Sequence, residues 1–209
     1  MKPRTEVLAF VALVLTPFAI AASLPFVSER FEHIEFPRCV PGKSVPWWDL
    51  ELWRTWCEIA ERKGPGPAYA STGFRAMLIR PCAAFRMLER GAELGDGESY
   101  AGMGHMLRSG SCVRADESRA IEAYEAAVRL RSPLGSSSLQ DVYDKRAKRG
   151  DGDPIEAAKW AFADPLIFGI SEEYARDYGQ RLGLSPAQIE EARERMRRWI
   201  DVNKVPTQK

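Results

Sequence analysis

The chain has 209 residues, of which 45% are hydrophobic and 28% are charged, and its formal net charge at pH 7 is +1. This is the composition of an ordinary globular protein, and the length is sufficient for one domain with its own hydrophobic core. Proteins dedicated to nucleic-acid binding usually carry a basic excess on one face, so the nearly neutral charge argues against a nucleic-acid partner.

The first 22 residues have the pattern of a secretory signal peptide. A positively charged start is followed by an apolar run over residues 7–15 and then by small residues, so cleavage is expected after Ala21 or Ala22. An alternative stays open, because residues 7–27 carry no charge and about 20 apolar residues can span a bilayer. The folded part is therefore expected to be periplasmic or secreted, or to lie in the periplasm on an uncleaved inner-membrane anchor.

Residues 23–43 contain prolines without helical periodicity and predict an extended lead-in. Ser44 can then cap a helix from about Val45 to Lys63. Its two adjacent apolar stripes are typical of a helix packed between neighbours. Residues 44–67 are thus expected to form a Trp-rich N-terminal capping helix that ends in a non-helical turn, Gly64-Pro65-Gly66-Pro67.

Two adjacent tryptophans, Trp47 and Trp48, occur in this capping segment. Adjacent residues on a helix cannot both face the same core, so one of the two is a candidate partner anchor, since tryptophan is enriched at interface hot spots. The alternative is that the cluster Trp47, Trp48, Trp53 and Trp56 forms the hydrophobic plug that caps the first hairpin.

Residues 68–170 predict a series of helical hairpins. Helices are expected over residues 68–79, 83–93, 98–108, 116–131 and 136–148, followed by one that begins at Pro154. The equivalent positions Gly73, Gly104 and Gln140 are 31 and 36 residues apart. Because a lone hairpin cannot bury its apolar face, successive hairpins are expected to stack.

Two further helices, over residues 171–203, are expected to cap the array before a tail at 204–209. The first has the apolar stripe Tyr174, Tyr178 and Leu182, and the second begins with a capping box from Ser185 to Gln188. No segment shows sustained alternation of apolar and polar residues. The predicted fold class is therefore all-α, a short α–α superhelix (solenoid) of helical hairpins.

The chain contains four cysteines, which fit an oxidising compartment and allow three disulfide connectivities. Cys82 and Cys112 each follow a Met-Leu pair at a predicted helix end, which places them at matching corners of neighbouring hairpins. We therefore expect the disulfides Cys82–Cys112 and Cys39–Cys57. The cysteines lack the paired spacing of zinc ligands, and no metal or other cofactor is expected.

One stretch resembles a known repeat. It reads Met103-Gly104-x-x-Leu107-x-x-Gly110-x-x-Val113-x-x-Asp116-x-x-x-Ala120-x-x-x-Tyr124-x-x-Ala127 and is similar to the Sel1-like repeat, a relative of the tetratricopeptide repeat. Residues 131–164 form a degenerate copy, with Gln140 where glycine is usual, and residues 68–95 form a weaker one. The segment 184–199 looks like the C-terminal tail common in bacterial Sel1-like proteins. The resemblance implies an α-solenoid scaffold for protein–protein contact, commonly at the bacterial cell envelope.

The functional expectation is a non-enzymatic scaffold that docks another protein. No residues in the sequence assemble into an acid, a base and an oxyanion donor. In such stacks the first helix of each hairpin generally lines the groove, and fixed helices bind with little ordering cost. The polar candidates on two successive first helices are Ser99, His105, Arg108, Gln140, Asp141 and Asp144. Membrane contact is expected only through residues 7–27, and only if they are retained.

Two alternatives follow from the resemblance. The corner Gly110-x-Cys112-Val113-x-x-Asp116 is similar to that of MotX-like proteins, short exported Sel1-like components of the flagellar motor. Some cysteine-rich Sel1-like proteins are credited with binding or hydrolysing β-lactams. In those proteins each repeat holds its own cysteine pair, whereas Cys112 has no second cysteine within its hairpin.

Overall fold

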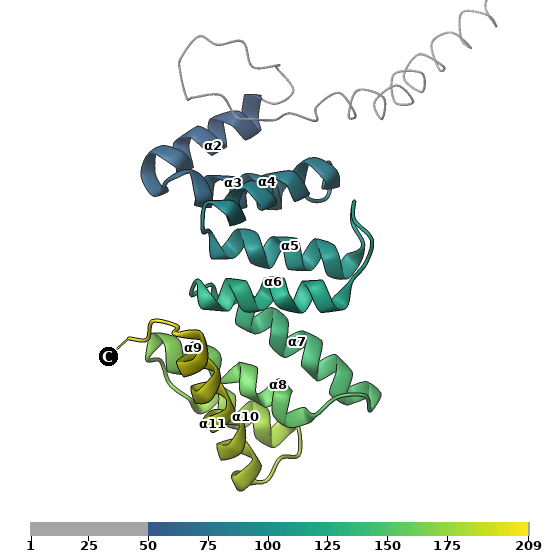
Figure 1. Ribbon diagram of the computed structural model, residues 1–209, viewed down its shortest axis with the longest axis vertical. Helices are drawn as coiled ribbons and strands as arrows, with labels where there is room; N and C mark the ends of the chain where they lie inside the picture. Colours follow the sequence, from purple (N-terminus) through teal and green to yellow (C-terminus); the bar gives the residue numbers. More distant parts are fainter. Residues whose placement is uncertain (1–49, 209) are drawn as a thin grey trace, which may run out of the picture. The chain divides into compact units, whose positions relative to one another are not determined.

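The computed structural model describes residues 50–208, and every regular element in this range is a helix (Figure 1). The helices are α2 (Leu50–Lys63), α3 (Pro65–Ala76), α4 (Pro81–Glu93), α5 (Gly97–Ser109), α6 (Glu117–Arg129), α7 (Pro133–Arg149), α8 (Pro154–Ala161), α9 (Ala163–Phe168), α10 (Glu173–Arg181) and α11 (Pro186–Asn203). The predicted all-α class is confirmed for this part of the chain. None of these helices combines the length and the apolar character needed to cross a bilayer.

Consecutive helices pack against one another. Within pairs, α3 packs on α4, α5 on α6 and α7 on α8, and the pairs are joined through α4–α5 and α6–α7 contacts (Figure 1). The first helices of successive pairs also meet, since α3 contacts α5 and α5 contacts α7. The helices that carry Gly104 and Gln140 therefore lie side by side, as the sequence predicts. This packing is compatible with a helical-repeat solenoid.

The two helices of a pair approach closely because a glycine on the first helix, which has no Cβ atom, leaves room for a large side chain of the second helix. A Cβ atom on Gly104 would lie 2.5 Å from Cε1 of Tyr124, whose side chain is fully buried. A Cβ atom on Gly73 would lie 2.8 Å from Cγ of Leu88, which is also fully buried. The α3–α4 and α5–α6 pairs thus share one packing arrangement. In α8 the position eight residues after the N-cap is held by Ala161, and Trp160 beside it is 1% exposed.

The junctions between pairs are also alike. Gly95 after α4 and Arg131 after α6 both have positive φ, at 79° and 61°. In each case the backbone N–H of the next residue donates to a carbonyl of the preceding helix. Asp96 donates to Gly91 at 3.0 Å, and Ser132 donates to Ala127 at 2.9 Å. A residue in the left-handed region followed by such a bond is a common way to end a helix. The chain therefore turns in the same way at two successive junctions.

Some predicted helix starts are wrong, and proline accounts for them. The segment Gly64–Pro67 was expected to be non-helical, but Pro65 is the first residue of α3. Likewise α4 begins at Pro81, and α7 begins at Pro133 rather than at residues 136–138. Proline fits the first helical turn because its missing N–H would have no partner there. The short helix α9 has no counterpart among the predicted elements.

The last helix confirms its predicted start and face. Ser185 and Gln188 form the capping box. The buried positions of α11 face α8, and the Trp199 ring meets that of Trp160 edge-on, with centroids 5.1 Å apart.

The expected packing stripe of α10 is wrong. Its buried residues are Ala175 and Gly179, whereas Tyr174 is 56% exposed. A Cβ atom on Gly179 would lie 2.8 Å from Cγ1 of Ile189, so small residues bring α10 against the start of α11. Tyr174 and Tyr178 each precede one of these small residues, so they lie about 100° around the helix from them, where their hydroxyl groups meet α7.

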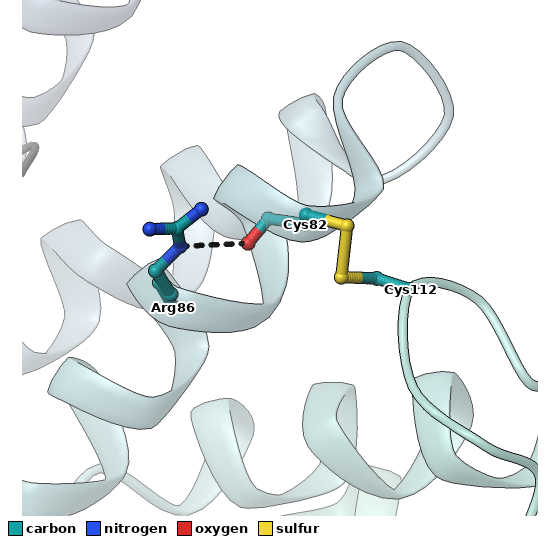
Figure 2. The surroundings of a disulfide bond; sticks show 3 residues. All are labelled: Cys82, Arg86 and Cys112. Carbon is teal, nitrogen blue, oxygen red and sulfur yellow. Dashed lines mark hydrogen bonds between the residues drawn. A yellow bond between two sulfur atoms is a disulfide. The ribbon is translucent and has the colours of Figure 1, made fainter. Parts of the chain in front are cut away.

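A disulfide joins Cys82, in the first turn of α4, to Cys112, in the corner between α5 and α6 (Figure 2). The Cα atoms are 4.9 Å apart, and the Arg86 Nε donates to the carbonyl of Cys82 at 3.5 Å. This predicted bond is confirmed, and it links the corners of two successive helix pairs. Cys39, the expected partner of Cys57, lies outside the described residues.

Candidate protein-binding face

The polar residues that the sequence predicts for a groove come together on neighbouring helices. His105 and Arg108 lie on α5, Gln140, Asp141 and Asp144 lie on α7, and α10 contributes two tyrosines that the sequence analysis assigned to packing. The term α5–α7–α10 face is used below for the set His105, Arg108, Gln140, Asp141, Asp144, Tyr174 and Tyr178.

An ion pair connects α5 to α7. Arg108 Nη1 lies 2.6 Å from Asp141 Oδ2, and the same oxygen accepts a hydrogen bond from Lys145 Nζ at 2.9 Å. Partial burial alone would raise the pKa of Asp141, but the hydrogen bonds from Lys145 and Arg108 outweigh it and hold this pKa below its usual range. Asp141 therefore presents a carboxylate that two cations already hold in place.

Beside this pair, the ring of His105 lies between two hydroxyl groups. Its Nδ1 is 3.2 Å from Tyr124 Oη, and its Nε2 is 3.4 Å from Ser138 Oγ. Burial, and then the positive charge of Arg108, lowers the pKa of His105, while Asp141 opposes the shift. Burial also raises the pKa of Tyr124 to about 12. At neutral pH this cluster is therefore uncharged apart from the neighbouring ion pair.

The tyrosines of α10 reach across to α7. Gln140 Nε2 donates to Tyr174 Oη at 2.9 Å, and Tyr178 Oη donates to Asp144 Oδ1 at 3.0 Å. Burial, together with the carboxylate of Asp144, raises the pKa of Tyr178. Both contacts join residues 34 positions apart, so α10 meets α7 in register. The two tyrosines are four positions apart, as are Gln140 and Asp144, and this shared spacing is the sequence signal that could have identified them.

The two tyrosines also form an aromatic surface. Their rings stack with centroids 6.1 Å apart and an interplanar angle of 16°, and the Arg181 guanidinium lies 5.8 Å from each centroid. Tyrosine supplies a large and rigid contact area at low entropic cost. Since Tyr174 is more than half exposed, this stack is available to a partner.

Ser99 does not belong to this face. Its side chain is fully buried, and a Cβ atom on Gly91 would lie 2.0 Å from its Oγ. Its side chain fills the contact between α4 and α5, so its prediction as a partner-binding residue is wrong. Trp47 and Trp48, as well as the cleavage positions Ala21 and Ala22, lie outside the described residues.

The chemistry of the face favours binding. Ser138 and His105 have the residue types of a nucleophile and a base, but Ser138 is only 5% exposed and fills the contact between helices. Among the residues that the structure describes, no three His, Cys, Asp or Glu side chains are grouped so as to hold a metal ion. What the face offers is fixed charges, hydrogen-bonding groups and an exposed aromatic stack.

Comparison with known proteins adds no relative. The chain matches no protein-family model, no curated protein and no solved structure.

Proposed function

We propose that this chain is a Sel1-like scaffold of the bacterial cell envelope, and that it binds another protein at the α5–α7–α10 face. In this account the helix pairs α3–α4, α5–α6 and α7–α8 are repeat units of a short solenoid. Helices α10 and α11 cap its C-terminal end.

The repeat assignment is supported by equivalent contacts at equivalent positions. Gly73 meets Leu88 in one pair and Gly104 meets Tyr124 in the next, and these residues hold corresponding places in the Sel1-like pattern. Stacked units of this kind share one continuous core and leave one side of the first helices for ligands.

The observation that carries the binding proposal is the connection of three helices into one polar surface. Hydrogen bonds and an ion pair run from Arg108 on α5 to Asp141 on α7, and from Gln140 and Asp144 to Tyr174 and Tyr178 on α10. Side chains fixed in this way lose little conformational entropy when a partner binds. Tyrosine and arginine are also the residue types that dominate interface hot spots.

The location is supported by chemistry. The Cys82–Cys112 disulfide is typical of an oxidising compartment, and the N-terminal pattern is that of an exported chain. The disulfide also bears on the β-lactam alternative. It joins two helix pairs, whereas the cysteine-rich Sel1-like proteins credited with that activity carry a cysteine pair inside each repeat, so a non-enzymatic role is favoured.

In-cell photo-crosslinking tests the proposal. A photoreactive amino acid is placed at Tyr174 or at Arg108, and the matched control carries it at Arg198, an exposed position of α11. The expected result is one crosslinked product of the same mass from the two face positions, absent from the control. Crosslinks that are absent at the face, or equal at all three positions, would refute the proposed binding face.

A further inference from the structure

Two apolar residues protrude at the corner between α3 and α4. Leu78 is 95% exposed and Ile79 is 82% exposed. Side chains this exposed make almost no contact with their own chain. Burying them in an apolar phase is therefore favourable, and the polypeptide fold leaves that gain unused.

The charge around this corner is one-sided. The stretch 64–88, which contains the corner, carries three arginines and no acidic residue, and the stretch 99–115 carries two arginines and no acidic residue. The chain as a whole has a net charge of only +1, and Arg108 in the second stretch is already paired with Asp141, so the excess positive charge comes from the remaining arginines. The Cys82–Cys112 disulfide ties one stretch to the other at the corner (Figure 2).

Two of these arginines are exposed beside the corner. Arg75 lies in the last turn of α3, three residues before Leu78, and Arg114 lies two residues after Cys112. Among the described residues, neither forms a salt bridge. Their positive charge is thus available to an external anion.

We propose that the corner that carries Leu78 and Ile79 binds the surface of an anionic lipid bilayer. Leu78 and Ile79 insert into the interface between headgroups and acyl chains, while Arg75 and Arg114 face the lipid phosphates. Protruding apolar side chains flanked by cations are typical of peripheral membrane contact. A protein partner would instead need a pocket that encloses two side chains standing clear of the surface.

Partition onto lipid vesicles tests the proposal with the full-length chain. Vesicles of phosphatidylcholine alone are compared with vesicles that also contain phosphatidylglycerol. The expected result is tighter binding to the anionic vesicles, and a loss of about tenfold when Leu78→Ser and Ile79→Ser are combined. The double variant Arg75→Glu with Arg114→Glu should lose the preference for anionic vesicles, at about fivefold or more per arginine.

Matched controls separate the corner from general effects. Val202→Ser removes an apolar side chain that is 80% exposed on α11, and Arg198→Glu with Lys204→Glu makes the same change in net charge elsewhere. Both controls should bind within twofold of the wild type. Any contribution of residues 7–27 is common to all variants and cancels in the comparison.

A second measurement does not depend on weakening the corner. Brominated lipids should quench the tryptophan fluorescence of the Ile79→Trp variant more than that of the wild type, whereas the Val202→Trp variant should show no added quenching. The proposal is overturned if the corner variants bind anionic vesicles like the wild type, as expected of a site for an acidic protein segment. It is equally overturned if the controls lose as much binding, or if Ile79→Trp shows no added quenching.

Discussion

Removing the disulfide between the two corners should have a large and calculable cost. The bond closes a loop with a sequence separation of 30 residues. With the usual loop-closure relation, a loop of about 30 residues lowers the entropy of the unfolded chain by about 12 cal/mol/K, or about 3.6 kcal/mol at 25 °C. For a chain of this size, such a loss corresponds to a fall of about 7–14 °C in the unfolding midpoint.

The assay is equilibrium unfolding in urea, followed by the helical circular dichroism signal. The double variant Cys82→Ser with Cys112→Ser is compared with Ser111→Ala, which removes an exposed hydroxyl from the same corner. The control should change the free energy of unfolding by less than about 0.5 kcal/mol. A loss below about 1 kcal/mol in the double variant would refute the reasoning, since the corners would then be held together without the covalent link.

Three further predictions concern the helix contacts. Gly104→Ala should lower the free energy of unfolding by about 1–2 kcal/mol. Overpacking against Tyr124 costs about 1–3 kcal/mol, and the better helix propensity of alanine returns at most about 1 kcal/mol. An unchanged unfolding temperature would contradict the close contact. Folding lowers the pKa of His105, so the unfolded chain takes up a proton on this residue at a higher pH than the folded protein does. The free energy of unfolding should therefore fall as the pH drops below about 6.5. In unfolding experiments from pH 7 to pH 5, His105→Gln should reduce the dependence of the free energy of unfolding on pH. An unchanged pH dependence would show that other groups cause it. The pKa of Asp141 is lower in the folded protein than in the unfolded chain. Its contribution to the free energy of unfolding is therefore full above its pKa in the unfolded chain, and it is lost as the pH falls through its pKa in the folded protein. Arg108→Ala should raise this pKa in a carboxyl NMR titration, and no change would show that the ion pair does not form.

Local patterns in the sequence were sufficient to predict the class of the fold and most of its elements. Asp116 and Asp153 cap α6 and α8 through their side chains, as expected from residues that accept from free amides. Such caps act within a few residues, so the sequence specifies them locally. The disulfide Cys82–Cys112 was predictable only with the further assumption that neighbouring hairpins stack and bring their corners together.

The errors come from choices that tertiary packing decides. Aromatic residues at helical spacing usually pack inward, so the sequence predicts that the tyrosines of α10 pack against neighbouring helices. The small residues Ala175 and Gly179 pack instead, since they allow α10 to approach its neighbours, and the hydroxyl groups of Tyr174 and Tyr178 find partners on α7. The burial of Ser99 depends in the same way on the nearness of another helix, which a local pattern does not specify.

The candidate face was only partly predictable for the same reason. His105, Arg108, Gln140, Asp141 and Asp144 were found because they fall on first helices of the repeat pattern. The contacts that these residues make across helices, with one another or with Ser138, Tyr174 and Tyr178, span 33 or 34 residues and depend on how the helices stack.

The most direct test of the central claim is the affinity of the crosslinked partner, once purified, for two double variants. Arg108→Ala with Asp144→Ala alters the α5–α7–α10 face, whereas Arg197→Ala with Glu194→Ala removes an exposed ion pair of α11. The account predicts that Kd rises about tenfold or more for the first variant, as expected for hot-spot residues, and stays within twofold for the second. Equal affinities for the wild type and both variants would contradict it.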